Sequence, residues 1–113
     1  MIKPEASYDT FSELDIRVGR IEEAKPVKGS EKLLELLVDL GKDYGNVTIL
    51  SGIATWYTCE ELVGKKTLFL ANLAPRKMMG MTSQGMLIAL NTSENEAKLV
   101  TIDQELAVGA YIC

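Results

Sequence analysis

The chain has 113 residues, of which 47% are hydrophobic and 25% charged, and its formal net charge is -4 at pH 7. This size and composition predict one soluble globular domain, residues 1–113, around a single small core. Histidine is absent and the two cysteines lie far apart, so we expect neither catalysis nor a bound metal or cofactor. No apolar run reaches the roughly 18 residues of a membrane span, and the first residues lack the apolar core of a signal peptide, which favours the cytoplasm.

The first predicted elements are a short helix at 7–14 and a long strand within 12–23. One face of this strand is apolar and the other is not: Leu14, Ile16 and Val18 alternate with Asp15, Arg17 and Gly19. After Gly19 the phase slips, because Ile21 falls on the face that carried Arg17. A one-residue slip at a glycine indicates a β-bulge, so we expect Gly19 to bend the strand there.

The second predicted strand, at 32–41, alternates more regularly. Its apolar face consists of Leu34, Leu36, Val38 and Leu40. The turn-forming sequence "GKDYGN" then leads to a third strand at 45–53. The later strands follow in chain order, two core strands and then two weaker ones: 65–73, 85–90, 98–102 and 109–113.

Residues 57–64 predict a short helix between the third and fourth strands. Thr58 can cap it, Glu61 stands three residues further on, and Gly64 can end it. Several short strands, this helix and a bent first strand predict an all-β fold, a five-stranded OB-fold Greek-key barrel with short helices and extra terminal strands. Another small β-barrel or a β-sandwich is the alternative, since alternation alone does not distinguish them.

The stretch "NLAPRKMMGMTSQGM", residues 72–86, contains the adjacent cations Arg76 and Lys77 and four methionines. No carboxylate occurs from Leu62 to Ser93. A second set of cations occupies the N-terminal third: Arg17, Arg20, Lys25, Lys28 and Lys32. If the two basic segments lie side by side, this acidic protein has one positive face that could hold a negatively charged partner. The alternative is chance clustering in a solvated turn.

Four blocks of the sequence, in order and suitably spaced, resemble the family of stand-alone tRNA-binding domains: "LDIRVGRI", "KLLELLVDLG", "ILSGIATWYTCEELVGKK" and "NLAPRKMMGMTSQGMLIA". This family includes the C-terminal domain of methionyl-tRNA synthetases, free-standing dimeric tRNA-binding proteins and domains of the endothelial-monocyte-activating-polypeptide type. The resemblance covers residues 11–113 and implies an OB-fold that binds tRNA by shape without catalysis. By this resemblance the protein would act alone or as an accessory to methionyl-tRNA synthetase.

Position by position, the resemblance implies RNA-binding roles for six residues, which are Arg17, Lys32, Asn72, Lys77, Ser83 and Met86. Arg76 joins them on charge alone. Arginine and lysine suit phosphates, and Asn72 and Ser83 suit the 2′-hydroxyl groups of duplex RNA. Alternatively, Asn72 and Ser83 only close the loop by hydrogen-bonding backbone groups, and Met86 fits a core position better than a contact.

The methionines keep a second function class open. Met78, Met79 and Met81 could form a soft, adaptable surface for peptides, as the resemblance to chaperone-like members of the family also implies. A purely structural dimerisation module in a synthetase complex is a third hypothesis. Three cations on one face, Arg17, Lys32 and Lys77, would favour RNA over a peptide.

Apolar residues at both ends of the chain predict a homodimer. The chain finishes with Tyr111, Ile112 and Cys113, and its start places Tyr8 and Phe11 on a short helix. A small barrel already fills its core with its own strands, so these side chains would form an exposed patch that two-fold pairing hides. The resemblance implies the same, since free-standing relatives are dimers. The alternative is that the tail adds a strand within its own subunit.

Overall fold

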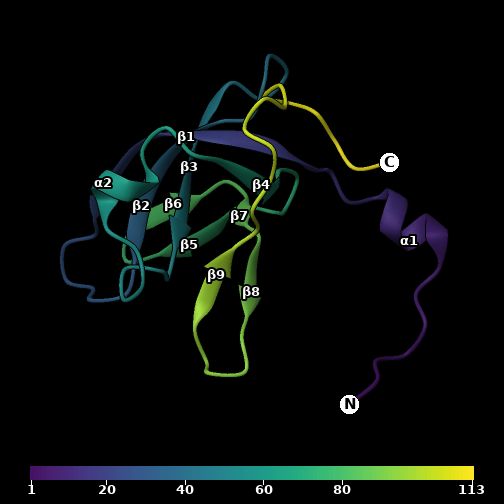
Figure 1. The fold of residues 1–113 in the computed structure, drawn as a ribbon, viewed down its shortest axis with the longest axis horizontal. Helices are drawn as coiled ribbons and strands as arrows, with labels where there is room; N and C mark the ends of the chain where they lie inside the picture. Colours follow the sequence, from purple (N-terminus) through teal and green to yellow (C-terminus); the bar gives the residue numbers. More distant parts are fainter.

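Five strands form one antiparallel sheet that nearly closes into a barrel (Figure 1). The computed structural model describes residues 1–113, and the strand order in this sheet is β3-β2-β1-β4-β7. These strands are β1 (Ile16–Pro26), β2 (Leu34–Asp39), β3 (Asn46–Ser51), β4 (Lys66–Leu70) and β7 (Met86–Leu87). Because β7 returns to lie beside β3, the connectivity is that of an OB-type Greek-key barrel, which confirms the predicted fold.

The interior of the barrel is apolar because β2 alternates as its sequence predicts. Its inward side chains Leu34, Leu36 and Val38 are buried, and so is Leu40 directly after the strand. In the pairing with β3, Leu36 lies opposite Ile49 and Val38 opposite Val47, so both strands contribute to one core. Phe69 of β4 is fully buried in the same cluster.

Strand β1 departs from the prediction, because its inward face carries Arg17, Gly19 and Ile21. All three point inward in simple alternation, so no phase slip occurs at Gly19. Gly19 instead makes room for the Phe69 ring, because a Cβ at this position would lie only 2.7 Å from Cδ2 of Phe69. The register shift falls between Ile21 and Glu23, so the strand does contain an irregularity, but the predicted position was wrong.

Both predicted helices form, as α1 (Tyr8–Ser12) and α2 (Cys59–Leu62). In α2, Thr58 Oγ1 accepts a hydrogen bond from the Glu61 backbone N–H at 3.2 Å, and the Glu61 carboxylate accepts one from the Thr58 N–H at 2.6 Å. These reciprocal bonds form the capping box that the sequence predicted. Gly64 follows with a φ of +89°, a conformation that suits glycine and ends the helix. Neither helix has the length and apolar character needed to cross a membrane.

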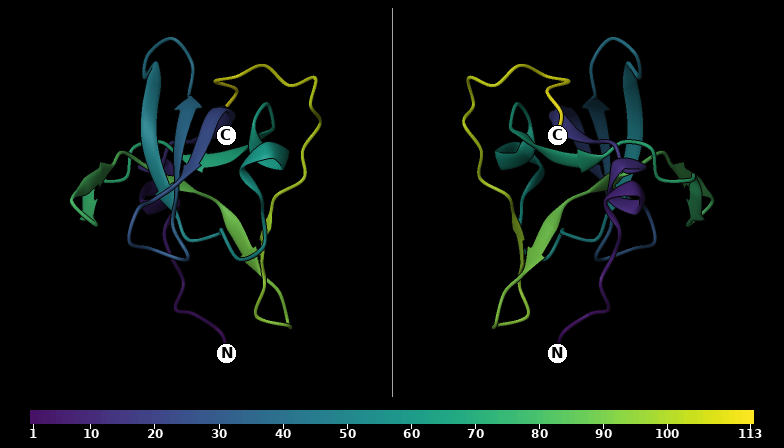
Figure 2. Two further views of the ribbon diagram at one scale, coloured as in Figure 1. Left: turned by 90° about the vertical axis from the view of Figure 1, so that its left-hand side faces the viewer. Right: turned by 90° about the vertical axis from the view of Figure 1, so that its right-hand side faces the viewer.

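Two small hairpins extend from the barrel. The first, β5 (Arg76–Met78) and β6 (Met81–Ser83), occupies the methionine-rich stretch between β4 and β7. The second joins β8 (Ala89–Asn91) to β9 (Ala97–Leu99), so the strand expected at 85–90 is divided between β7 and β8. Figure 2 shows the β5–β6 hairpin, in green, on the side of the barrel opposite to the C-terminal segment, in yellow.

The C-terminal segment pairs with β1 of its own chain. The Val18 N–H donates to Ala110 O at 2.7 Å, the Gly109 N–H to Val18 O at 2.9 Å, and the Ile112 N–H to Ile16 O at 2.9 Å. This explains why Val18 is buried although it points away from the main core. The tail thus adds a strand-like segment within its own subunit, and Tyr111 nevertheless remains 71% exposed.

Candidate nucleic-acid interface

The β5–β6 hairpin presents two cations to solvent. Arg76 lies opposite Ser83 and Lys77 opposite Thr82, and neither cation forms an ion pair. The two turn residues, Met79 and Gly80, have φ angles of +52° and +76°. Positive φ at both positions gives the tight two-residue turn whose twist matches that of the flanking strands.

The turn between β1 and β2, residues 27–33, carries two more free cations. The Ser30 N–H donates to Val27 O at 3.1 Å, and the Ser30 hydroxyl accepts from the Leu33 N–H at 3.1 Å, so the turn is ordered from within. Lys28 and Lys32 are both exposed and make no ion pair. Their ammonium groups are therefore available to a ligand.

The hairpin and the turn meet at Met79 and Gly29. A Cβ on Gly29 would lie 3.3 Å from the Met79 methyl carbon, which is the only atom within 4 Å of that position. The contact brings the two basic segments together, as the charge pattern suggested. We call Lys28, Lys32, Arg76 and Lys77 the basic surface. In OB-folds the loops between strands 1 and 2 and between strands 4 and 5 of the barrel flank the nucleic-acid site, and these four residues lie in those loops.

The base of the hairpin is attached to β3 through Ser83 and Gln84. The buried Ser83 hydroxyl accepts from the Leu50 N–H at 3.0 Å and donates to Gly85 O at 3.1 Å. The Gln84 N–H donates to Thr48 O at 2.8 Å, and the Gln84 side-chain oxygen accepts from the Thr48 N–H at 3.2 Å. We call these bonds the seam, because they join β3 to the last part of the barrel. The Ser83 hydroxyl thus bonds backbone groups within the fold.

Met86 does not lie in the core, so the expected core position was wrong. Its side chain is 36% exposed, whereas that of Leu87 is buried. Alternation explains this, since neighbouring residues of β7 point to opposite faces and only one can face the barrel. The outward position leaves Met86 accessible to a partner.

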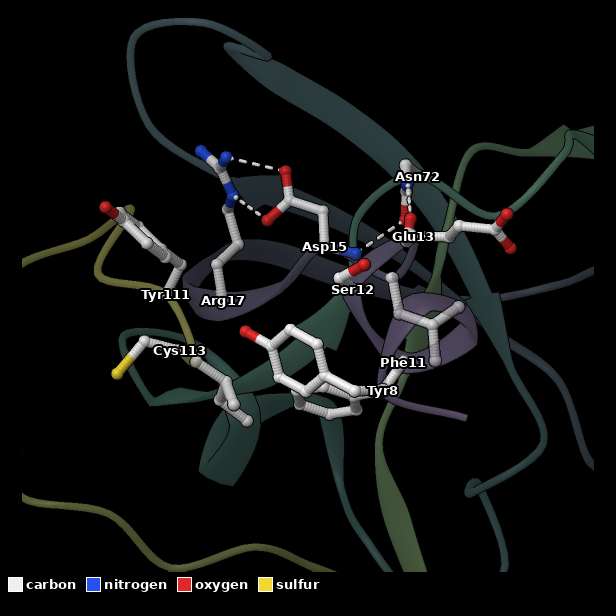
Figure 3. A pocket seen from close by; sticks show the side chains of 11 residues that line it. Tyr8, Phe11, Ser12, Glu13, Asp15, Arg17, Asn72, Tyr111 and Cys113 are labelled. Atoms are coloured by element: carbon white, nitrogen blue, oxygen red, sulfur yellow. Dashed lines mark hydrogen bonds and ion pairs between the residues drawn. The ribbon is translucent and has the colours of Figure 1, made fainter. Parts of the chain in front are cut away.

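Asn72 fixes the segment that follows α1. Its side-chain oxygen accepts from the Asp15 N–H at 2.8 Å, and its amide nitrogen donates to Glu13 O at 2.7 Å (Figure 3). Beside it lies a groove of about 560 Å³ between α1, the start of β1 and the C-terminal segment. We call this the terminal groove, and its apolar lining consists of Tyr8, Phe11, Leu14, Tyr111, Ile112 and Cys113.

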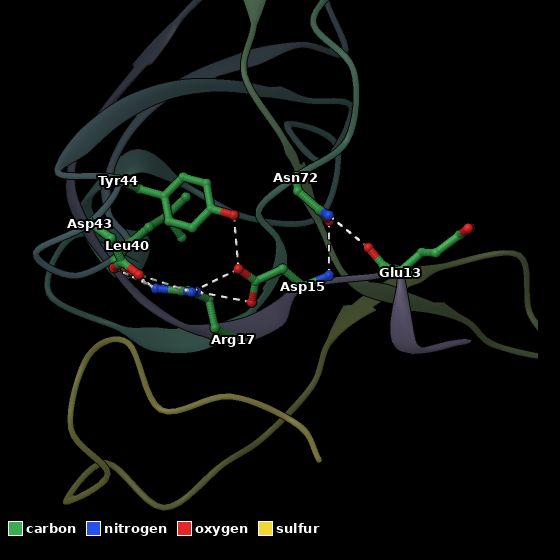
Figure 4. A network of polar contacts seen from close by, with 7 residues as sticks. All are labelled: Glu13, Asp15, Arg17, Leu40, Asp43, Tyr44 and Asn72. Carbon is green, nitrogen blue, oxygen red and sulfur yellow. Dashed lines mark hydrogen bonds and ion pairs between the residues drawn. The ribbon is translucent and has the colours of Figure 1, made fainter. Parts of the chain in front are cut away.

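Arg17 is 7% exposed and its guanidinium is enclosed by polar partners (Figure 4). Nη2 lies 2.7 Å from Asp15 Oδ2, and Nη1 lies 2.9 Å from Asp43 Oδ1 and 3.1 Å from Leu40 O. The Tyr44 ring stacks against it, with its centroid 4.6 Å from Cζ, and the Tyr44 hydroxyl donates to Asp15 Oδ2 at 2.8 Å. The backbone of Arg17 also forms an isolated antiparallel β-bridge with Tyr111. Arg17 therefore lies next to the C-terminal segment and not on the basic surface.

These contacts shift the pKa values of Arg17 and of the side chains around it, which are Asp15, Asp43 and Tyr44. The hydrogen bond from Arg17 lowers the pKa of Asp15, although burial acts in the opposite direction. The same guanidinium lowers the pKa of Asp43, and the hydrogen bond to Asp15 raises the pKa of Tyr44. The pKa of Arg17 itself is raised, mainly by its bond to Asp15. The carboxylates therefore neutralise Arg17 at neutral pH.

The outward face of β1, β2 and β3 is acidic. A shallow groove of about 260 Å³ lies there between Glu23 and Glu35, and the only cation along it, Lys25, is 3.8 Å from Glu35 Oε1. A phosphate backbone would be repelled from such a face. No group of three or more histidine, cysteine or acidic side chains is placed to hold a metal ion.

The sequence reasoning located three of the four cations of the basic surface but did not include Lys28 among the site residues. The signal available for Lys28 was its charge, since no quoted motif contains it. Nothing in the sequence indicated that Met79 would touch Gly29, because the two residues are far apart along the chain.

Comparison with known proteins gives consistent findings. The model of a family described as "Putative tRNA binding domain" matches residues 16–111. A methionine–tRNA ligase of Clostridium acetobutylicum is 44% identical in an alignment of 113 positions that covers 98% of this chain and 17% of the ligase. The chain therefore spans only a small part of that relative's length.

Two solved structures are also similar. One is a MetRS related protein from Pyrococcus horikoshii, with a TM-score of 0.90 and 37% identity, covering 98% of this chain and 100% of the other. The second is a CsaA chaperone protein from Picrophilus torridus, with a TM-score of 0.87 and 29% identity, covering 96% of this chain and 100% of the other.

Proposed function

The chain belongs to the family of tRNA-binding domains, and from this premise we propose that it binds tRNA through the basic surface. The observation that carries the proposal is the contact between the hairpin and the turn, which gathers four exposed cations that have no carboxylate partner. In this proposal the protein is a non-catalytic domain of the cytoplasm that binds the phosphate backbone of tRNA. The protein acts alone or beside methionyl-tRNA synthetase.

Recognition would follow the shape of the RNA rather than its sequence. Duplex RNA hides its base edges in a deep, narrow groove, so phosphates and 2′-hydroxyls are the accessible groups. Arginine and lysine at the basic surface suit the phosphates. The chain has only seven aromatic residues, and three of the four exposed ones, Tyr8, Phe11 and Tyr111, line the terminal groove instead of the basic surface, which disfavours a single-strand binder built on stacking.

Within this proposal the expected site residues have different roles. Lys32, Arg76 and Lys77, together with Lys28, contact phosphates, and the exposed Met86 lies close enough in the chain to the hairpin to contribute contact area. Asn72, Ser83 and Arg17 act through the fold, because their polar atoms already have backbone or carboxylate partners.

The salt dependence of tRNA binding tests the proposal. Four phosphate contacts predict a slope of log affinity against log salt of about -3 to -4. Replacing Arg76 and Lys77 together by alanine should weaken binding of all tRNAs and flatten the slope by about 2. The double variant Lys3→Ala, Lys42→Ala is the matched control, because it removes the same charge from exposed residues without ion pairs.

Filter binding should compare bulk tRNA, duplex RNA and single-stranded RNA at several salt concentrations. Binding that is independent of salt, or equal losses in the hairpin variant and the control variant, would refute the basic surface as the site. A preference for single-stranded RNA would refute recognition by shape.

We propose a homodimer as the assembly, paired through the terminal groove. The tail already forms a strand on its own β1, but Tyr8, Phe11, Tyr111 and Ile112 stay exposed around one groove. Two-fold pairing of this patch would bury both copies, and the two basic surfaces could then span one tRNA. Sedimentation at micromolar concentration measures the assembly. Deleting Tyr111 to Cys113 should weaken dimerisation and tRNA binding together, and a monomeric wild-type protein would refute the claim.

Peptide binding is the second candidate, favoured by the likeness to a CsaA chaperone structure. The hairpin methionines offer only a limited surface for it, since Met78 and Met81 are half-buried and the Met79 methyl packs on Gly29. Competition decides between the two candidates. An unfolded polypeptide that displaces tRNA and binds more tightly than tRNA would favour the peptide candidate.

A further inference from the structure

We propose that Met79 is a positioning residue, whose side chain holds the free end of the β5–β6 hairpin against Gly29 and so assembles the basic surface. This inference rests on the proposed function and adds to it the side-chain contact that keeps the cations of the hairpin close to those of the turn. It is carried by two observations that are independent of each other, the backbone conformation of Met79 and the contact that its methyl group makes.

The backbone conformation of Met79 is unusual. Only two residues other than glycine have a positive φ, Met79 at +52° and Asn95 at +59°. Asparagine tolerates this region because its short side chain can hydrogen-bond locally, whereas methionine has no such compensation. Two-residue hairpin turns strongly favour Asn-Gly or Asp-Gly, and here Met-Gly stands in that place. Strain of this kind persists where another interaction maintains it.

The contact at Gly29 supplies that interaction. Gly29 itself has a φ of +88°, and the Met79 methyl carbon lies 3.3 Å from the position of its missing Cβ. The turn therefore offers a flat patch of backbone, on which a long flexible thioether side chain can lie. Met79 remains 53% exposed, so burial in the main core does not explain the choice of methionine.

The hairpin needs such a contact because of its size and charge. It has three residues in each strand, and a two-stranded hairpin of this length is marginal without support. Its base is held by Ser83 and Gln84 at the seam, which leaves the opposite end to be fixed by the turn. The four cations around the contact repel one another and form no ion pair that offsets this repulsion, so an apolar attachment helps to keep them close.

The test uses Met79→Asn, which improves the turn but removes the attachment. Asparagine with Gly80 is the preferred turn pair, and the net charge is unchanged, so the melting temperature should stay the same or rise. The short polar side chain cannot cover Gly29, so tRNA affinity should fall about five-fold, because the RNA must then order the hairpin itself. The salt slope should stay at its wild-type value, since every cation is still present.

Met79→Leu is the matched variant, because it keeps an apolar side chain in the same strained conformation. We expect it to retain most of the wild-type affinity. Equal losses in Met79→Leu and Met79→Asn would overturn the proposal, and so would wild-type affinity in Met79→Asn. A flattened salt slope in Met79→Asn would also overturn it, because that result indicates a lost phosphate contact rather than lost positioning.

A measurement without RNA separates this proposal from the proposed function. In protein labelled at the methionine methyl groups, a nuclear Overhauser effect between the Met79 methyl and the Gly29 α-protons is expected. Amide exchange across 28–32 should accelerate in Met79→Asn. If both effects are observed but the wild-type protein binds no tRNA, the attachment is supported and the proposed function fails. Absence of the Overhauser effect overturns the attachment itself.

Discussion

Arg17 illustrates at the residue scale how a cation can be buried inside a small barrel. Its planar guanidinium has five N–H donors, so it can bond two carboxylates and the Leu40 carbonyl at the same time. Asp15 and Asp43 come from different segments, and Arg17 therefore joins the start of β1 to the β2–β3 turn. A lysine could not satisfy this set of acceptors.

Lowering the pH should destabilise the fold through this cluster. The pKa of Asp15 is lowered from its ordinary value of 3.8 by Arg17. Its contribution to the free energy of unfolding is therefore complete above the pKa of the unfolded chain, and it is lost as the pH falls through the lower folded value. The urea midpoint, followed by Trp56 fluorescence, should decline below about pH 5.

Asp15→Asn tests the cause of this decline. The variant should have a lower urea midpoint than wild type at neutral pH and a shallower decline on acidification. Asp9→Asn is the control, because it removes a carboxylate that makes no ion pair. A profile of Asp15→Asn that runs parallel to wild type would contradict the assignment.

Ser83→Ala should destabilise the protein by about 1–3 kcal/mol, because it leaves the buried Leu50 N–H and Gly85 carbonyl without their hydroxyl partner. Urea unfolding measures the change. Thr82→Ala, at the exposed neighbouring position, should have a far smaller effect. Equal stability of the two variants would show that the Ser83 bonds are dispensable.

At the scale of the element, β1 depends on a partner from the opposite end of the chain. Its outward residue Val18 is covered only because the C-terminal segment runs along it. The pairing requires Gly109, whose φ of +94° suits glycine. Gly109 also lies against Gly41, because a Cβ added to Gly41 would be 3.2 Å from the Gly109 Cα. The segment thus works as an additional strand, although it forms few regular bonds.

Deleting 109–113 should therefore lower the stability of the barrel. The deletion removes three hydrogen bonds to Ile16 and Val18, at about 1 kcal/mol each, and uncovers an apolar side chain. Thermal unfolding at low protein concentration measures the effect on the single chain. Deleting 1–6, which makes no hydrogen bond to the barrel, is the control and should leave the melting temperature unchanged.

The elements that the sequence predicted are those with local causes. The alternation of β2 and the capping box of α2 lie within a few residues, and both are observed. The bulge in β1 was misplaced because the need for Gly19 comes from Phe69, which is distant in the chain. Likewise, the sequence contained the cations of the candidate site but not the two carboxylates that neutralise Arg17. Each difference between the sequence prediction and the structure therefore comes from a partner that is distant in the chain.

At the scale of the whole molecule, charge is distributed unevenly. The protein has a net charge of -4, yet the hairpin side carries four unpaired cations and the outward face of β1, β2 and β3 carries Glu23 and Glu35. An approaching polyanion would be repelled from one face and attracted to another. The charge pattern would therefore orient the protein before any contact forms.

The seam has a consequence for the motions of the barrel. Elsewhere the five strands are joined by backbone ladders, but at the seam the side chains of Ser83 and Gln84 take part in three of the four bonds. Side-chain attachments open more easily than a ladder, so the amides of Leu50 and Thr48 should exchange with deuterium sooner than those in the middle of β2. Because the seam also carries the hairpin, each opening would swing Arg76 and Lys77 away from the two lysines of the turn. Bound tRNA should slow exchange at Leu50 and Thr48, and unchanged exchange rates would show that the hairpin moves independently of the barrel.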